Sequence, residues 1–360
     1  MKRFLKILGI VFASVILLVG LFFGYLTLFE YRPKKIEVLK VENLVHKNIE
    51  LNRTYTALTF NIGYASLGID EDFVMDGGKK GKTDNLSVMT GYLNGIKNIL
   101  KERNADIYLI QEVDLKARRS YYVNEVAEIF NTLGNSYNST FAYNFKAQFV
   151  PFPLSFTDYI GYVKGGLLTL SRFTFVHAER QQFPGSFAWP LRIANLKRAM
   201  VTHELPISGS DKKLIVVNLH MSAYDGDGSL RTKEMEFLKS FLIDQNKLGN
   251  YVLVGGDFNQ TFPDAIGKYP PIQDIWIAYE MEKDFLPEGY TVAIDTNLPS
   301  CRLLNKPYDP KDPTTQYYII DGFIVSNNIT VESVLNLNHG FLYSDHNPIQ
   351  LQFRLQASTQ

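Results

Sequence analysis

Several apolar, strand-like segments of this sequence end in polar residues of the kinds that bind metal ions or move protons. The segment "YVLVGGDFNQ" runs through two glycines into Asp257 and Asn259, and their spacing of two would point both side chains the same way from an extended chain. The glycines are expected to let a phosphate approach the backbone closely. In chain order, the polar residues at such strand ends are Asn61, Glu112, His220, Asp257, Asn259, Asp321, Asp345 and His346.

Each of these residues alone has a simple explanation, such as a turn or a solvated strand end, but as a set they indicate a site for a hard divalent cation. Carboxylates and amides supply the oxygen ligands that Mg²⁺ and Mn²⁺ prefer, whereas zinc favours histidine and cysteine. Proteins commonly hold Mg²⁺ through one or two carboxylates together with substrate phosphates. The set therefore predicts phosphoester chemistry, in which the protein also supplies a base for water and donors for the charge that builds on phosphorus.

One of the carboxylates has an unusual sequence context. Asp321 lies between the apolar runs "YYII" and "GFIV". A carboxylate inside an apolar strand costs several kcal/mol unless it is paired or bound to a metal. We therefore expect Asp321 to have a partner, and a histidine is the natural one.

Strands and helices alternate along much of the chain. Segments rich in β-branched and aromatic residues predict strands, namely "TALTFNI", "ADIYLIQEVD", "GGLLTLSRF", "KLIVVNLH", "YVLVGG" and "YYIIDGFIV". Apolar residues at helical spacing predict helices from Asp84 to about Leu100 and from Arg231 to Lys247. The class is therefore α/β with layered sheets, in which functional groups gather on the loops that leave the strands.

The N-terminal region contains an uncharged apolar run over residues 7–29. This run is longer than the core of a signal peptide and lacks a small-x-small cleavage site at its end, which favours a permanent transmembrane signal-anchor. Basic residues flank the run on both sides, so the positive-inside rule barely decides its orientation. A span this close to the start commonly exports the rest of the chain. We expect a single-pass membrane protein with a catalytic domain outside the cytoplasm, divided into a short tail (1–6), the signal-anchor (7–29), a juxtamembrane segment (30–53) and the catalytic domain (54–356).

Charge and cysteine content restrict the functional classes. Lys and Arg number 37, as do Asp and Glu, so the net charge is zero and there is no global basic field of the kind that drives non-specific nucleic-acid binding. A local basic groove remains compatible with this balance. The single cysteine, Cys301, excludes an internal disulfide framework and a cysteine-rich zinc site.

The ordered motifs TFN, QE, NLH, GDFN, IDGFIV and SDHNPI resemble those of the endonuclease/exonuclease/phosphatase superfamily, and "GGLLTLSRF" resembles the family's strand with a Ser-Arg ending. Its members include DNase I-like nucleases, neutral sphingomyelinases and inositol-polyphosphate 5-phosphatases. The resemblance covers about residues 56–353. It implies a four-layer α/β sandwich of two mixed β-sheets flanked by helices, with the site where their loops converge.

The resemblance also implies which residues handle the metal and the water. By position in the motifs, Glu112 would be the main ligand of Mg²⁺ or Mn²⁺, with Asn61 and Asp345 close to the metal. Asp257 would orient or deprotonate the attacking water. The implied reaction is in-line attack of that water on a phosphodiester.

The remaining residues would act on the phosphate. Asn259 and His220 would hold its oxygens, and His346 would donate to it while Asp321 fixes the tautomer of His346. Nothing in the matched motifs is missing, so we expect an active enzyme rather than a catalytically inactive binding protein.

The core motifs do not choose the substrate. A membrane-tethered nuclease is one hypothesis, and a lipid or small-molecule phosphoesterase, sphingomyelinase-like or inositol-phosphatase-like, is the other. The aromatic stretches 144–165 and 183–192 could stack bases or enter a lipid interface, unless they simply pack on the sandwich. The basic loop 76–84 could be a solvated turn or could meet a phosphate backbone or an anionic headgroup. The expected partners are the phosphoester substrate and, through the N-terminal helix, the membrane; no protein partner is predicted.

Overall fold

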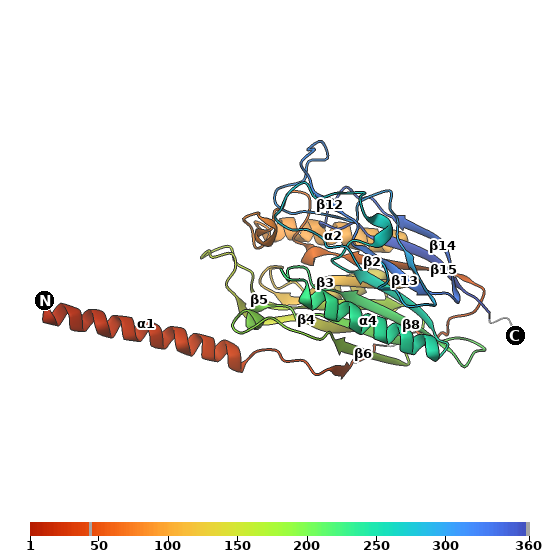
Figure 1. Cartoon of the computed structure of the whole chain (residues 1–360), viewed down its shortest axis with the longest axis horizontal. Helices are drawn as coiled ribbons and strands as arrows, with labels where there is room; N and C mark the ends of the chain where they lie inside the picture. The colour runs from red at the N-terminus through yellow and green to blue at the C-terminus, as the bar shows by residue number, and fades with distance from the viewer. Residues whose placement is uncertain (43–44, 358–360) are drawn as a thin grey trace.

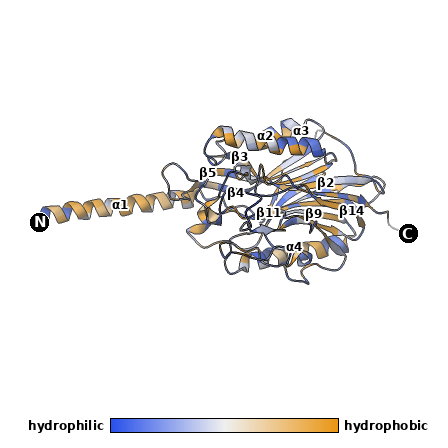
Figure 2. Cartoon of the chain, turned by 90° about the horizontal axis from the view of Figure 1, so that it is seen from above, coloured by the Kyte–Doolittle hydropathy of each residue, from blue (hydrophilic) through white to orange (hydrophobic). Residues whose placement is uncertain are grey.

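The computed structural model describes residues 1–42 and 45–357 of the chain. Two mixed β-sheets pack against each other, and helices cover their outer faces (Figure 1, Figure 2). The predicted α/β class, with two mixed sheets flanked by helices and one N-terminal apolar helix, is confirmed.

The larger sheet has seven strands in the order β1-β6-β7-β8-β9-β13-β10. β8 and β9 run parallel, and the other neighbouring pairs run antiparallel. In chain order these strands are β1 (Ile36–Val38), β6 (His177–Gln182), β7 (Ala199–Pro206), β8 (Lys213–His220), β9 (Tyr251–Asp257), β10 (Tyr290–Ala293) and β13 (Asp321–Ser326).

The second sheet has six strands in the order β14-β15-β2-β3-β5-β4. Its parallel pair is β2 and β3. Its strands are β2 (Thr54–Asn61), β3 (Ile107–Ala117), β4 (Asn138–Val150), β5 (Gly161–Ser171), β14 (Ile329–Asn336) and β15 (Ile349–Leu355). A separate two-stranded ribbon pairs β11 (Cys301–Arg302) with β12 (Tyr317–Tyr318).

Helices cover the outer face of each sheet, as Figure 2 shows. α2 (Leu86–Arg103) and α3 (Glu125–Leu133) pack on the six-stranded sheet, and α4 (Ser229–Lys247) packs on the seven-stranded sheet. Each of these helix–sheet contacts is an apolar layer. A further apolar layer lies between the two sheets and includes Leu109 from β3 and Leu253 from β9. The short 3-10 helices are η1 (Gly63–Ala65), η2 (Val74–Asp76), η3 (Leu191–Ala194) and η4 (Pro263–Ala265).

Two segments differ from the sequence-based expectation. "YYIIDGFIV" is divided, because β12 ends at Tyr318 and β13 begins at Asp321. Asp321 therefore opens a strand instead of lying inside one. The aromatic stretch 144–165 is largely the end of β4 and the start of β5, which form a long antiparallel hairpin.

The two glycines before Asp257 serve packing between strands. A Cβ on Gly255 would lie 2.6 Å from Cδ1 of Leu109 on the opposite sheet, and one on Gly256 would lie 2.1 Å from the Leu219 carbonyl oxygen. No side chain fits at either distance, so β9 can lie this close to β8 and β3 only with glycine at both positions. The expectation that the glycines also let a phosphate approach the backbone stays a prediction.

The N-terminal helix α1 (Lys2–Leu28) projects away from the two-sheet domain (Figure 1). It is long and apolar enough to cross a membrane, and Figure 2 shows it as mainly hydrophobic along its length. Within α1, which is described in full, Leu26 is the one buried residue. The helix therefore makes its contact with the domain at its C-terminal end.

Candidate active site

Five central strands, three from one sheet and two from the other, bring predicted site residues together. In the larger sheet, Asp257 at the end of β9 stands opposite both His220 of β8 and Asp321 of β13. In the other sheet, Asn61 ends β2 and Glu112 lies on the neighbouring β3. Except for Asp321, all the predicted site residues line one cavity of about 530 Å³, namely Asn61, Glu112, His220, Asp257, Asn259, Asp345 and His346.

Asn61 connects the two sheets at this cavity. Its Nδ2 donates to Oδ2 of Asp257 at 3.0 Å and lies 3.4 Å from Oε1 of Glu112. Its Oδ1 accepts a hydrogen bond from the backbone N–H of Gly63 at 3.1 Å, which orients the amide. The side chain therefore sets the spacing between the carboxylates of β3 and β9.

Asp321 has the histidine partner that its sequence context required. Its Oδ2 lies 2.8 Å from Nδ1 of His346, and both side chains are buried. Burial disfavours the charged imidazole, but the negative charge of Asp321, with contributions from Asp345 and Asp257, outweighs burial and raises the pKa of His346 well above its usual value. Asp321 therefore favours the protonated imidazole of His346, whose Nε2 lies on the side of Asp257, 3.8 Å from its Oδ2.

Asp257 combines burial with a second carboxylate nearby. Burial, followed by the charge of Asp321, raises the pKa of Asp257 to about 7. A base with a pKa near the working pH is well suited to accept a proton from water. His220 stands beside it, with Nε2 3.4 Å from Oδ2 of Asp257, and burial lowers the pKa of His220 well below its usual value. His220 is therefore a neutral imidazole.

The chain after Asp257 is not extended, in contrast to the expectation from residue spacing. Asn259 has φ +52°, and its backbone N–H donates to Oδ1 of Asp257 at 2.9 Å, which forms a tight side-chain-closed turn. Its Nδ2 donates to the Met221 carbonyl at 2.8 Å. Asn259 still reaches the cavity, and one N–H of its amide remains for a ligand.

Glu112 owes its position to an irregularity in β3. The register between β3 and β5 shifts between Ile110 and Val113, and Glu112 has φ +53°. Such a bulge re-aims a side chain that regular pleating would place elsewhere. The carboxylate is partly open to the cavity, with 21% of the side chain exposed.

Asp345 and Glu112 fit a hard cation. Burial raises the pKa of Asp345 to about 7, and the nearby charge of Glu112 contributes to the rise. A divalent cation stabilises the charge of a buried carboxylate that lies close to another one, and oxygen ligands suit Mg²⁺ or Mn²⁺.

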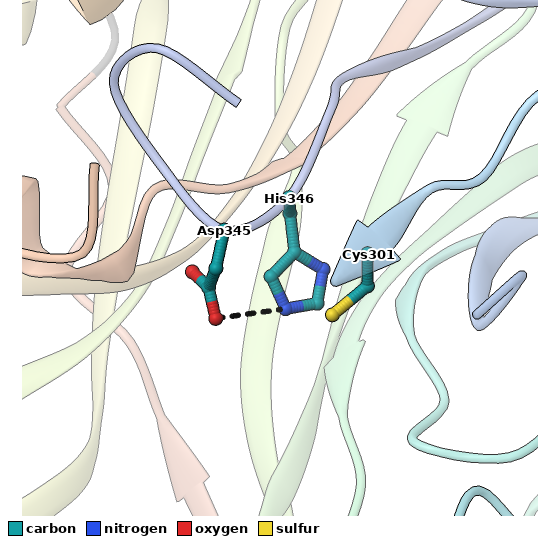
Figure 3. Close-up of side chains that lie close together, drawn as sticks. All are labelled: Cys301, Asp345 and His346. Atoms are coloured by element: carbon teal, nitrogen blue, oxygen red, sulfur yellow. Dashed lines mark ion pairs between the residues drawn. The ribbon is translucent and has the colours of Figure 1, made fainter. Parts of the chain in front are cut away.

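Figure 3 shows Asp345 facing His346, with Cys301 beside the imidazole. Oδ2 of Asp345 lies 3.9 Å from Nε2 of His346. Candidate ligand atoms of these three residues lie within 4.8 Å of one another, as do those of Asp257, Asp321 and His346. Burial raises the pKa of the Cys301 thiol, so neither it nor the protonated His346 is a good ligand. The carboxylates are the members suited to a metal.

Several charged residues at the cavity were not predicted from the sequence. Arg119 makes two 3.0 Å hydrogen bonds to Asp114 and stacks 3.7 Å from the centre of the Tyr64 ring. Arg198 also lines the cavity, and its buried Nη1 has no hydrogen-bond partner within the described ranges. Asp114 comes two residues after Glu112 in "QEVD", a spacing that could have indicated it, whereas nothing near Arg198 in the sequence marks it.

This α/β fold of two packed sheets presents acidic, amide and imidazole side chains at one strand edge, an arrangement suited to a metal ion and a phosphate. Residues 58–346 match the model of the Endonuclease/Exonuclease/phosphatase family, and the chain belongs to that family. Members of the family are phosphoester hydrolases and generally depend on divalent metals.

Solved structures agree with this assignment at the level of the fold. The endonuclease/exonuclease/phosphatase of Beutenbergia cavernae is 14% identical with a TM-score of 0.61, over 85% of this chain and 73% of that one. The corresponding protein of Bacteroides vulgatus is 15% identical with a TM-score of 0.53, over 85% and 100%. The human Nocturnin catalytic domain, solved with a sulfate anion, is 16% identical with a TM-score of 0.52, over 88% and 98%. The sequence matches no curated protein.

Proposed function

We propose that this protein is a membrane-tethered, divalent-metal-dependent phosphoester hydrolase that cleaves a phosphodiester by in-line attack of water. The observation that carries the proposal is the single cavity at which both sheets present their polar strand ends. The side chains that line this cavity supply oxygen ligands, a base and a cationic donor within one site. These are the groups that hydrolysis at phosphorus requires.

The carboxylates of Glu112 and Asp345, with the amide of Asn61, would hold Mg²⁺ or Mn²⁺, which when bound neutralises the charge that builds on the phosphate oxygens. Asp257 orients the attacking water and accepts its proton, since its pKa of about 7 is suited to that transfer. The water then attacks a phosphate that neighbouring side chains already hold.

Asn259 and His220 bind oxygens of the phosphate as neutral donors. His346, kept protonated by Asp321, donates from Nε2 to the phosphate. A cationic donor in a water-poor cavity stabilises developing negative charge far better than it would in bulk water. Asp321 acts through His346 and is a positioning residue.

Removal of divalent metal is expected to stop turnover reversibly. Treatment with EDTA should abolish hydrolysis of the soluble diester bis-(p-nitrophenyl) phosphate, and excess Mg²⁺ or Mn²⁺ should restore it, because the clustered carboxylates then regain their counter-charge. Circular dichroism in EDTA serves as the control that the fold persists. Full activity after exhaustive chelation would contradict the metal assignment.

We also propose that α1 spans a membrane and that the domain after it lies outside the cytoplasm. The support is the length and apolar composition of α1 and its position at the start of the chain. Protease added to intact cells is expected to degrade the domain while cytoplasmic marker proteins survive. Protection of the domain until the cells are permeabilised would reverse the orientation.

A further inference from the structure

The cavity that holds the proposed catalytic residues has a polar end and a much larger apolar wall. The polar end is the strand edge described above. Away from it, the wall consists of apolar side chains from α1, the β4–β5 hairpin and the η3 segment, among them Phe22, Leu26, Phe149, Phe152, Leu191 and Leu196. A volume of about 530 Å³ is in the range of small-molecule sites, in which apolar walls bind apolar parts of the ligand. A substrate with only polar groups would leave this wall unused.

The membrane helix itself forms part of that wall. Rings of Phe22 and Phe149 meet edge to face with centroids 5.8 Å apart, and those of Phe23 and Trp189 meet at 6.1 Å. Nε1 of Trp189 donates to Oγ1 of Thr27 at 3.1 Å. α1 is therefore in direct contact with the two segments that flank the cavity.

A buried ion cluster fixes the end of α1 at the cavity. The side chain of Glu30 is 3% exposed and receives Nζ of Lys197 at 2.9 Å, Nε of Arg32 at 3.1 Å and Nε of Arg192 at 3.3 Å. Arg192 belongs to η3, so the cluster joins the helix to the wall of the cavity. The ion pairs of Glu30 thus hold the segment that follows α1 against the wall of the cavity.

The contact between α1 and the hairpin gives the depth of the hairpin in a bilayer. Phe22 lies six residues before Leu28, the last residue of α1, which corresponds to roughly 9 Å along the helix. Its partner Phe149 would therefore lie at the level where interfacial segments bury their apolar side chains. Leu154 and Phe156, farther along the hairpin loop, are 89% and 101% exposed. In Figures 1 and 2 this loop projects on the side of the domain from which α1 leaves.

Two of the lysines in the basic loop 76–84 are engaged by neighbouring side chains. In the loop 76–84, Nζ of Lys80 pairs with Glu71 at 3.0 Å and Asp84 at 3.1 Å. Nζ of Lys82 lies over the ring of Tyr121, 4.9 Å from its centroid. Lys79 of the same loop is exposed and Arg198 lines the cavity, so it is the apolar wall that favours a lipid over a nucleic acid.

We propose that the substrate is a phosphodiester lipid of the membrane, drawn from the bilayer alongside α1. This inference rests on the proposed phosphoester hydrolysis. The phosphate occupies the polar end and the hydrocarbon chains lie along the apolar wall. Water adds its hydroxyl to phosphorus, the P–O bond to the chain-bearing alcohol breaks, and that alcohol leaves with a proton. The products are an apolar alcohol, which stays in the bilayer, and a water-soluble phosphomonoester.

The test uses the full chain reconstituted with Mg²⁺ in vesicles of phosphatidylcholine, phosphatidylethanolamine, phosphatidylglycerol and sphingomyelin. Phosphorus NMR measures the release of soluble phosphomonoester, and bis-(p-nitrophenyl) phosphate and supercoiled plasmid are assayed in parallel. A competition assay makes the test independent of headgroup preference. Dodecylphosphocholine below its micelle concentration is expected to inhibit hydrolysis of the soluble diester, whereas phosphocholine alone is not.

A variant with serine at both exposed hairpin positions, Leu154→Ser with Phe156→Ser, tests the membrane contact. It is expected to lower lipid hydrolysis about tenfold and to leave hydrolysis of the soluble diester unchanged, because neither residue lines the cavity. The matched control is Leu248→Ser, another exposed apolar residue, which precedes β9 at the end remote from Asp257. It should change neither rate.

The outcomes separate the two proposals. Cleavage of the soluble diester or of plasmid, with neither lipid cleavage nor inhibition by dodecylphosphocholine, overturns the lipid inference and leaves the proposed hydrolase standing. An equal loss of lipid hydrolysis in the hairpin variant and the Leu248→Ser control overturns the membrane contact. Absence of turnover on every substrate, the soluble diester included, overturns the hydrolase itself.

Discussion

Replacing Asp257 with alanine is expected to lower kcat for phosphodiester hydrolysis by about 10²–10⁴-fold, the usual contribution of a positioned general base. Asp257 is buried at the end of β9, and its pKa of about 7 suits proton transfer from water. Asp257→Asn is a sharper variant, since its amide oxygen can still accept the hydrogen bond from the Asn259 backbone while the side chain can no longer act as a base. The expected loss is as large as in Asp257→Ala.

Steady-state kinetics on bis-(p-nitrophenyl) phosphate, with thermal melting to confirm folding, measure this effect. Because Asp257 acts on water rather than on the substrate, kcat should fall while KM stays within a few-fold of its original value. Asp244→Asn is the control, since Asp244 is an exposed residue of α4 paired with Lys247. Near-normal turnover in either Asp257 variant would mean that the site has been wrongly identified.

Replacing His346 with alanine is the second change with a large expected effect, about 10²–10³-fold in kcat, which is the typical loss for a donor to transition-state charge. Asp321, whose Oδ2 lies 2.8 Å from Nδ1 of His346, favours the protonated imidazole despite its burial, and alanine removes this cationic donor. His177→Ala on β6 is the control, because that histidine is partly exposed and outside the cavity. A His346→Ala enzyme that is folded and fully active would remove the cationic donor from the mechanism.

The pair formed by Asp321 and His346 can be tested as a unit. Asp321→Asn alone should reduce kcat less than His346→Ala does, because the imidazole remains in place. If Asp321 acts through His346, the double variant should be no slower than His346→Ala alone. If instead the loss in kcat of the double variant equals the product of the two single losses, Asp321 has a role independent of His346.

Much of the fold and most of the polar site could be predicted because strand ends are local features of sequence. Asp257, His220 and Asp321 each stand at the end or start of an apolar strand, and neighbouring strands of one sheet bring such ends together. The need of Asp321 for a partner was likewise predictable, since burial of a lone carboxylate is costly. The assignment of roles to these residues stays a prediction until the variants are measured.

The features that could not be predicted depend on contacts between segments far apart in the chain. Glu112 reaches the cavity because of a bulge with positive φ, and no local sequence feature indicates this bulge. Arg198 is placed there by the start of β7, without any motif of its own. The aromatic stretch 144–165 divides in the structure, because Phe145 is buried whereas Phe156 is fully exposed. Composition alone could not separate these two environments.

The ion cluster around Glu30 has a consequence for how the protein meets its substrate. Because Glu30, two residues after α1, pairs with Arg192 of η3 and with Lys197, the mouth of the cavity would stay next to the helix in the bilayer while the molecule diffuses laterally. If the substrate shares that bilayer, its supply depends on the number of molecules per unit area, an effective concentration set by confinement to a surface. The surface density of substrate around each enzyme molecule is then the same in a dilute vesicle suspension as in a dense one.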